Sequence, residues 1–198
     1  MIRDFQLADF LTLGNGFSGM GSVLAAMKYL VSADATYLKL SFGLLPIALV
    51  CDFLDGRVAR MRNKVSMLGQ ELDSLADLVS FGVAPSVMAF TLGMRGGWDA
   101  AILIFFVGCG ISRLARYNAT AATLSDNAGK VKYFEGTPIP TSVVLVGVLA
   151  WAAWQGRVGD AVWGGVLAVG PWTLHPLVLM FALSGTLMVS KTLRIPKL

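Results

Sequence analysis

Four aspartates stand in two pairs inside an otherwise apolar chain. Asp52 and Asp55 are three residues apart, and Asp73 and Asp77 are four apart. Residues at these spacings share one face of a helix. An ionised aspartate at the centre of a membrane costs on the order of 3 kcal/mol, so two pairs on neighbouring apolar segments indicate a functional site rather than packing.

The chemistry that suits this set is binding of a hard metal ion. Converging carboxylates without partners would repel one another and take up protons. Oxygen ligands favour Mg²⁺, Mn²⁺ or Ca²⁺ over zinc. His175, the only histidine, is expected at a helix end, and Cys51 is expected to serve packing.

Small residues share the aspartate stripes. Gly56 and Ala59 follow the first pair, Gly69 precedes the second, and Arg60 is next to Ala59. Small residues commonly allow helices to pack closely in membranes. Beside four carboxylates and a guanidinium, which suits phosphate, they favour an anionic ligand held next to the metal.

The composition is that of an integral membrane protein. The 198 residues are 56% hydrophobic and 14% charged, whereas soluble domains carry roughly 25% charged residues. A membrane helix needs about 20 mostly apolar residues. Six spans are predicted, at 10–31, 37–61, 70–94, 98–118, 138–154 and 174–192. The apolar stretch 156–173 is too short to span, and we expect a loop or a re-entrant turn there.

These spans and the chain length predict an all-α membrane protein with one domain over residues 1–198. Residues 2–10 mix apolar and charged side chains and are expected to form a short interfacial helix. Lysine and arginine gather before the first span, after the second and fourth, and after the last, which places both termini in the cytoplasm. This flanking pattern fits a membrane surface or an anionic substrate and not nucleic acid.

The spacing Asp52-x2-Asp55-Gly56-x2-Ala59-Arg60-x8-Gly69-x3-Asp73-x3-Asp77 resembles the signature of the CDP-alcohol phosphotransferase family at every fixed position. That family consists of six-helix membrane enzymes, usually homodimers. They use divalent metal to displace CMP from a CDP-linked lipid or alcohol. The resemblance implies that the four aspartates bind metal and that Asp77 is also the catalytic base. It places Asn15, Gly56, Ala59, Arg60 and Gly69 beside the CDP.

Further segments are similar to the phosphatidylserine synthases within that family. They are "TLGNGFSG", "ELDSLADLVSFGVAPS", "RLARYN", "YFEGTPIPTS" and "MVSKTLRIPKL". This similarity implies CDP-diacylglycerol and L-serine as substrates. It also implies an active site on the cytoplasmic side of a bacterial inner membrane or the endoplasmic reticulum. Arg113, Arg116 and Asn118 could bind serine, or they could only anchor the fourth span.

Two alternatives stay open. Another member of the family would use glycerol 3-phosphate or an inositol phosphate as the acceptor. Arg113, Arg116, Lys130 and Lys132 could then form the extra phosphate pocket. An ion transporter or channel would need acidic residues along a route across the whole bilayer. The aspartates instead cluster at one predicted depth, which favours the enzyme.

Overall fold

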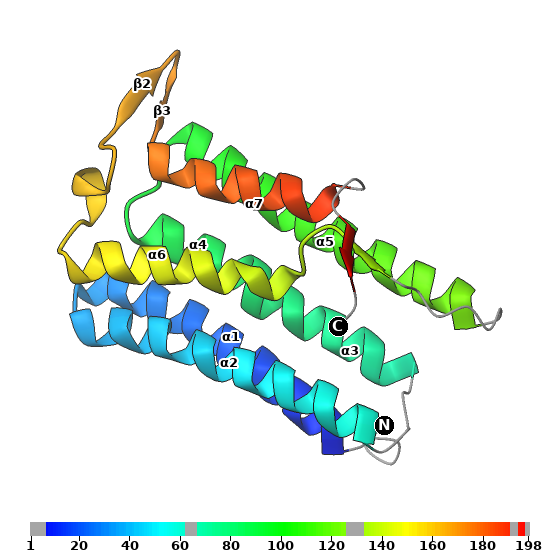
Figure 1. Cartoon of the computed structure of the whole chain (residues 1–198). Coiled ribbons are helices and arrows are strands. Elements are labelled where there is room, and N and C mark those ends of the chain that lie inside the picture. Colours follow the sequence, from blue (N-terminus) through cyan, green and yellow to red (C-terminus); the bar gives the residue numbers. More distant parts are fainter. Residues whose placement is uncertain (1–6, 62–66, 126–132, 191–193, 197–198) are drawn as a thin grey trace. The chain divides into compact units, whose positions relative to one another are not determined.

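The computed structural model describes residues 7–61, 67–125, 133–190 and 194–196, and it is mostly helical (Figure 1). The chain divides into two compact units, Met1–Met88 and Ala89–Leu198. The residues of the predicted metal site belong to the first unit. The expectation of a single domain over the whole chain stays a prediction.

The first unit is built from long helices. They are α1 (Leu7–Ser32), α2 (Ala35–Met61), α3 (Met67–Asp77), the π-helix η2 (Leu78–Val83) and the first half of α4 (Ala84–Thr91). Helix α1 packs along α2 and also contacts α3 and η2. It therefore lies against both helices that carry the aspartate pairs.

Glycines of α1 make this close packing possible. A methyl group added at Gly14 would lie 3.5 Å from Cys51 Sγ of α2, which agrees with the packing role expected for that cysteine. On another side of α1, a methyl group at Gly19 would come within 2.7 Å of Ser80 Cα. The backbone of η2 thus approaches α1 more closely than any side chain would allow.

A π-helical turn follows directly after Asp77. The backbone N–H of Ala84 bonds to the carbonyl of Val79, five residues earlier. Pro85 has no N–H to donate, and its ring would crowd the carbonyl four residues earlier in a regular α-helix. A wider turn relieves this conflict, and such turns are frequent at functional sites.

The second unit combines helices with short strands. After α4 it contains α5 (Gly97–Ser125), β1 (Tyr133–Glu135), η3 (Ile139–Ser142), α6 (Val143–Trp154), η4 (Gly159–Ala161), β2 (Leu167–Val169), β3 (Trp172–Leu174), η5 (Pro176–Val178), α7 (Leu179–Val189) and β4 (Arg194–Pro196). Strands β1 and β4 pair antiparallel, and β2 and β3 form an antiparallel hairpin. Helix α5 packs against α7, where the rings of Phe106 and Phe181 meet edge to face at 5.2 Å.

Three of the six predicted spans match helices that are long and apolar enough to cross a membrane. They are Ala35–Val58, Leu68–Thr91 and Gly97–Ala119. The fifth and sixth correspond to the shorter apolar helices Ile139–Trp154 and Pro176–Val189. Helix α1 has 26 residues, but its glycines and Asn15 lower its mean hydropathy. The chain is therefore a helical protein with membrane-spanning segments.

The structure changes two details of the predicted architecture. The all-α expectation omitted the short strands. The stretch 156–173, expected as a loop or re-entrant turn, is a connection without an α-helix that contains the 3₁₀ turn η4, β2 and most of β3. Of the predicted interfacial helix, residues 1–6 lie outside the described residues, and residues 7–10 are the first turn of α1.

Candidate active site

The two aspartate pairs lie on neighbouring helix ends of the first unit. Asp52 and Asp55 are within the last three turns of α2, and Asp73 and Asp77 lie in the second half of α3. Asp55 and Asp77 are buried, with 5% and 7% of their surface exposed. Asp52 and Asp73 are half-buried.

Three of the four carboxylates come together. One oxygen from each of Asp52, Asp55 and Asp73 can be chosen so that all three lie within 4.8 Å of one another. The structure therefore confirms that α2 and α3 bring acidic side chains to one place. The spacing within each helix put both members of a pair on one face, and the packing of the helices turned these faces toward each other.

Asp55 is held by a residue of α1. The hydroxyl of Thr12 donates a hydrogen bond to Asp55 Oδ2 at 2.6 Å, and Thr12 is itself buried. A buried carboxylate is stabilised when a donor faces it. This bond fixes the Asp55 carboxylate.

Asp77 is held in a similar way, one helical turn beyond Asp73. The side-chain amide of Asn15 donates to Asp77 Oδ1 at 3.0 Å. Asn15 is fully buried, and its backbone carbonyl accepts a hydrogen bond from Ser80 Oγ at 2.9 Å. The π-helical turn thus fixes the segment of α1 that orients Asp77. That Asp77 also binds metal stays a prediction.

The residues fit a divalent cation. Oxygen ligands that bind one Mg²⁺ at about 2.1 Å in octahedral geometry lie roughly 3 to 4.2 Å apart, so the three carboxylates, which lie within 4.8 Å of one another, would move closer together to bind it. Asp73 Oδ1 is buried and has no hydrogen-bond partner among the described residues, and the same holds for Asn15 Oδ1. Buried oxygens without a donor are ready to accept a cation or a ligand group.

The other predicted site residues are placed less completely. Gly56 and Gly69 are half-buried on α2 and α3, respectively. Ala59 and Arg60 belong to α2, but their side chains lie outside the described part. The contacts of all four with CDP stay predictions. Asn15 has a described contact with the predicted base, Asp77, and its predicted contact with CDP also stays a prediction.

The predicted serine-binding residues belong to α5 of the second unit. Arg113, Arg116 and Asn118 are half-buried. The Arg116 guanidinium donates to the carbonyl of Val189, the last residue of α7, at 3.4 Å. This contact is typical of a cation at a helix C-terminus and supports an anchoring role for Arg116. Serine binding by these residues stays a prediction, and Lys130 and Lys132 lie outside the described residues.

Sequence reasoning did not assign Thr12 or Ser80 to the site. Thr12 and Asn15 are three residues apart in "TLGNGFSG", so they share a face of α1. This pattern could have indicated that one face of α1 supports the acidic residues. For Ser80 no signal existed, because its contact depends on the π-helical turn.

Comparison with known proteins decides the family. The family model described as CDP-alcohol phosphatidyltransferase matches residues 5–187. This chain belongs to that family. The match confirms the resemblance carried by the aspartate spacing, and the three-carboxylate group lies on residues of this motif.

Curated relatives within the CDP-alcohol phosphatidyltransferase family carry more specific names. A CDP-diacylglycerol–serine O-phosphatidyltransferase of Saccharomyces cerevisiae is 44% identical over 200 residues, covering all of this chain and 72% of the relative. One from Helicobacter pylori is 39% identical over 144 residues, covering 72% of this chain and 56% of the relative. An archaetidylserine synthase of Methanothermobacter thermautotrophicus is 31% identical over 153 residues, covering 74% and 60%.

Proposed function

We propose that the chain is a phosphatidylserine synthase that transfers the phosphatidyl group of CDP-diacylglycerol to L-serine and releases CMP. The observation that carries the proposal is the group formed by Asp52, Asp55 and Asp73, with Asp77 oriented next to it by Asn15. The names of the curated relatives support the choice of substrates.

Asp77 would act as the general base. The serine hydroxyl gives its proton to the Asp77 carboxylate while its oxygen attacks the phosphorus that carries diacylglycerol. The bond from this phosphorus to the oxygen bridging the two phosphates breaks, and that oxygen leaves with CMP. A positioned base contributes roughly 10²–10⁴-fold to such a reaction. Asn15 keeps the base in place by donating to one of its two oxygens.

The remaining aspartates would hold the diphosphate through a divalent cation, Mg²⁺ or Mn²⁺. When bound, this cation neutralises the diphosphate and the negative charge that develops on the departing CMP. The chain itself supplies orientation. Thr12 fixes Asp55, and Gly56, Ala59, Arg60 and Gly69 are proposed to border the CDP. Phosphoryl transfer depends mainly on such positioning and charge stabilisation.

The proposal also covers the membrane topology and the oligomeric state of the enzyme. We propose a single catalytic domain with six membrane spans, both ends in the cytoplasm, and assembly as a homodimer. The aspartates lie near the end of α2 and within the first half of Leu68–Thr91, which suits a site just below the cytoplasmic surface. The lipid tails would stay in the membrane while serine enters from water.

The decisive test is an acceptor comparison with purified protein and CDP-diacylglycerol. We expect CMP release that requires L-serine and is lost when the divalent cation is removed. Release only with glycerol 3-phosphate or an inositol phosphate would overturn the choice of serine and favour another reaction of this family. Cation flux into liposomes without turnover of the lipid would overturn the enzyme itself.

A further inference from the structure

The hairpin of β2 and β3 presents apolar side chains and no charge. Residues 161–174 contain no Asp, Glu, Lys or Arg. All three residues of β2 are exposed, and so are Val166 and Trp172. Large apolar side chains gathered on a protein surface mark a region that contacts another apolar phase.

This hairpin is fastened to the first turn of α5. A methyl group added at Gly96 or Gly97 would collide with the backbone of Thr173 or the ring of Trp172, so β3 lies directly on this glycine pair. The Trp98 ring meets the Trp172 ring edge to face at 5.2 Å. The indole N–H of Trp98 also donates to the carbonyl of Val169 at 2.9 Å.

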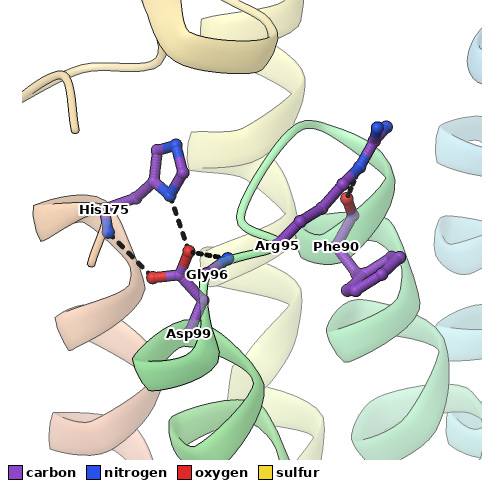
Figure 2. A network of polar contacts seen from close by, with 5 residues as sticks. All are labelled: Phe90, Arg95, Gly96, Asp99 and His175. Carbon is purple, nitrogen blue, oxygen red and sulfur yellow. Dashed lines mark hydrogen bonds and ion pairs between the residues drawn. The ribbon is translucent and has the colours of Figure 1, made fainter. Parts of the chain in front are cut away.

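A buried aspartate secures the base of the hairpin, as Figure 2 shows. Asp99 Oδ2 accepts the N–H of Gly96 at 2.8 Å and contacts His175 Nδ1 at 2.6 Å, while Oδ1 accepts the N–H of His175 at 2.8 Å. Asp99 is fully buried and His175 nearly so. His175, which directly follows β3, is thereby tied to Asp99 in the first turn of α5.

The position of the hairpin along the membrane normal follows from α5. The span Gly97–Ala119 has 23 residues and rises about 35 Å, slightly more than the hydrocarbon thickness of about 30 Å. Its first residue, Gly97, therefore lies at one boundary of the apolar layer. The hairpin, which is attached at that residue, must lie at the same boundary.

The backbone of the hairpin limits how deeply it can lie. Each strand has three residues, and within the described part of the chain β2 and β3 form a two-stranded sheet, which leaves outward-facing N–H and C=O groups on both strands. Such groups are costly in hydrocarbon but find water among lipid headgroups. Tryptophan is enriched at this depth because its ring is apolar and its N–H is polar.

We propose that the β2–β3 hairpin is a membrane anchor that lies in the interface between lipid headgroups and acyl chains. Val166, Leu167, Val169 and Trp172 would contact the upper acyl chains, and Trp98 and Asp99 would fix the hairpin at that depth. Its occupant is the lipid bilayer, which already surrounds the adjoining span. This function is separate from catalysis at the aspartate group.

The test measures the depth of a label on the hairpin of the full chain in vesicles of phosphatidylcholine and phosphatidylglycerol. With Cys51 and Cys109 replaced by serine, Leu167→Cys carries an environment-sensitive fluorophore. The control is Asp160→Cys, an exposed position just before the hairpin. We expect several-fold weaker quenching by aqueous iodide at 167 than at 160. Lipids with a nitroxide near the headgroup should quench the label more strongly than lipids with a nitroxide at the chain end.

Two results would overturn the proposal. Equal iodide quenching at both positions would place the hairpin in water. Protection of the 167 label from both iodide and nitroxide lipids would mean that protein, such as a second copy of the chain, covers it. Adding Asp99→Ala to Leu167→Cys should increase iodide quenching. Unchanged quenching would contradict the role of Asp99 in fixing the hairpin.

Discussion

Buried aspartates serve opposite purposes in the two units. In the second unit, the two oxygens of Asp99 receive two backbone N–H groups and the ring of His175. In the first unit, Asp52, Asp55 and Asp73 have one another as neighbours, and Asp73 Oδ1 has no hydrogen-bond partner among the described residues. A buried carboxylate must be compensated. Asp99 finds its compensation inside the fold, whereas the acidic group could be compensated by a bound cation.

Under the proposed function, this difference separates the structural Asp99 from the aspartates of the active site. A carboxylate with all its partners in the chain has no remaining capacity to bind substrate, but it locks distant segments together. A group of carboxylates that share too few donors is unstable alone and gains from binding a cation. Substitutions in the two places should therefore separate stability from catalysis.

The largest effect is expected from Asp77→Asn. The amide cannot accept the proton of serine, so serine-dependent CMP release should fall by roughly 10²–10⁴-fold. Binding of CDP-diacylglycerol should largely survive. Asp34→Asn is the control. Asp34 is exposed in the α1–α2 turn, and its substitution also removes one negative charge. Near-normal turnover in Asp77→Asn would show that another group is the base.

The next prediction compares Asp99→Ala with Asp73→Ala by thermal unfolding in detergent, with and without Mg²⁺. Asp99→Ala leaves buried donors unpaired and should lower the free energy of unfolding by about 3 kcal/mol in both conditions. Without Mg²⁺, Asp73→Ala should be as stable as the parent or more so, since repulsion is relieved.

Adding Mg²⁺ should distinguish Asp73→Ala from Asp99→Ala by how much each variant is stabilised. At a hundredfold excess over its dissociation constant the ion should stabilise the parent by about 2.7 kcal/mol. Asp73→Ala should gain much less, while Asp99→Ala should gain as much as the parent. Equal Mg²⁺ stabilisation of Asp73→Ala and the parent would contradict the cation site.

Gly19→Ala should have a smaller effect, confined to the first unit. The added methyl group would overlap Ser80, whose hydroxyl supports Asn15, so we expect a loss of about 2 kcal/mol in unfolding free energy. Gly43→Ala is the matched control, because open space surrounds Gly43 on α2. It should be neutral or stabilising. Similar unfolding midpoints for both variants would contradict the close approach of α1 and η2.

Thr12→Val should have the smallest effect. The change keeps the side-chain shape but removes the donor to Asp55, which is worth about 1.5 kcal/mol for a charged acceptor. We expect a higher Mg²⁺ concentration for half-maximal CMP release. Thr36→Val, at an exposed position at the start of α2, serves as the control. An unchanged Mg²⁺ requirement would show that Thr12 does not position Asp55.

Much of the aspartate group could be predicted from the sequence, but its supports could not. The spacings of Asp52 with Asp55 and of Asp73 with Asp77 fix their shared faces, since the helical period is a local property. Thr12 and Asn15 meet their aspartates across 43 and 62 residues of chain, respectively. Such contacts depend on how each helix is rotated against its neighbour.

The contacts of the β2–β3 hairpin could likewise not be predicted from the sequence. The stretch 156–173 is too short to span, which correctly excludes another membrane helix. Its attachment to Gly96 and Trp98 links residues more than 70 positions apart, and no local sequence pattern indicates it. The role of Asp99 was missed for this reason.

The sequence by itself determined a helical membrane protein of the CDP-alcohol phosphatidyltransferase family, with aspartates spaced for a metal. Composition and helical period carry this information, because both act over a few turns of chain. Only the tertiary structure decided which carboxylates converge, which residues of α1 orient them, and that Asp99 is internally satisfied. These outcomes depend on side-chain packing between helices, where a displacement of a few ångströms creates or removes a hydrogen bond.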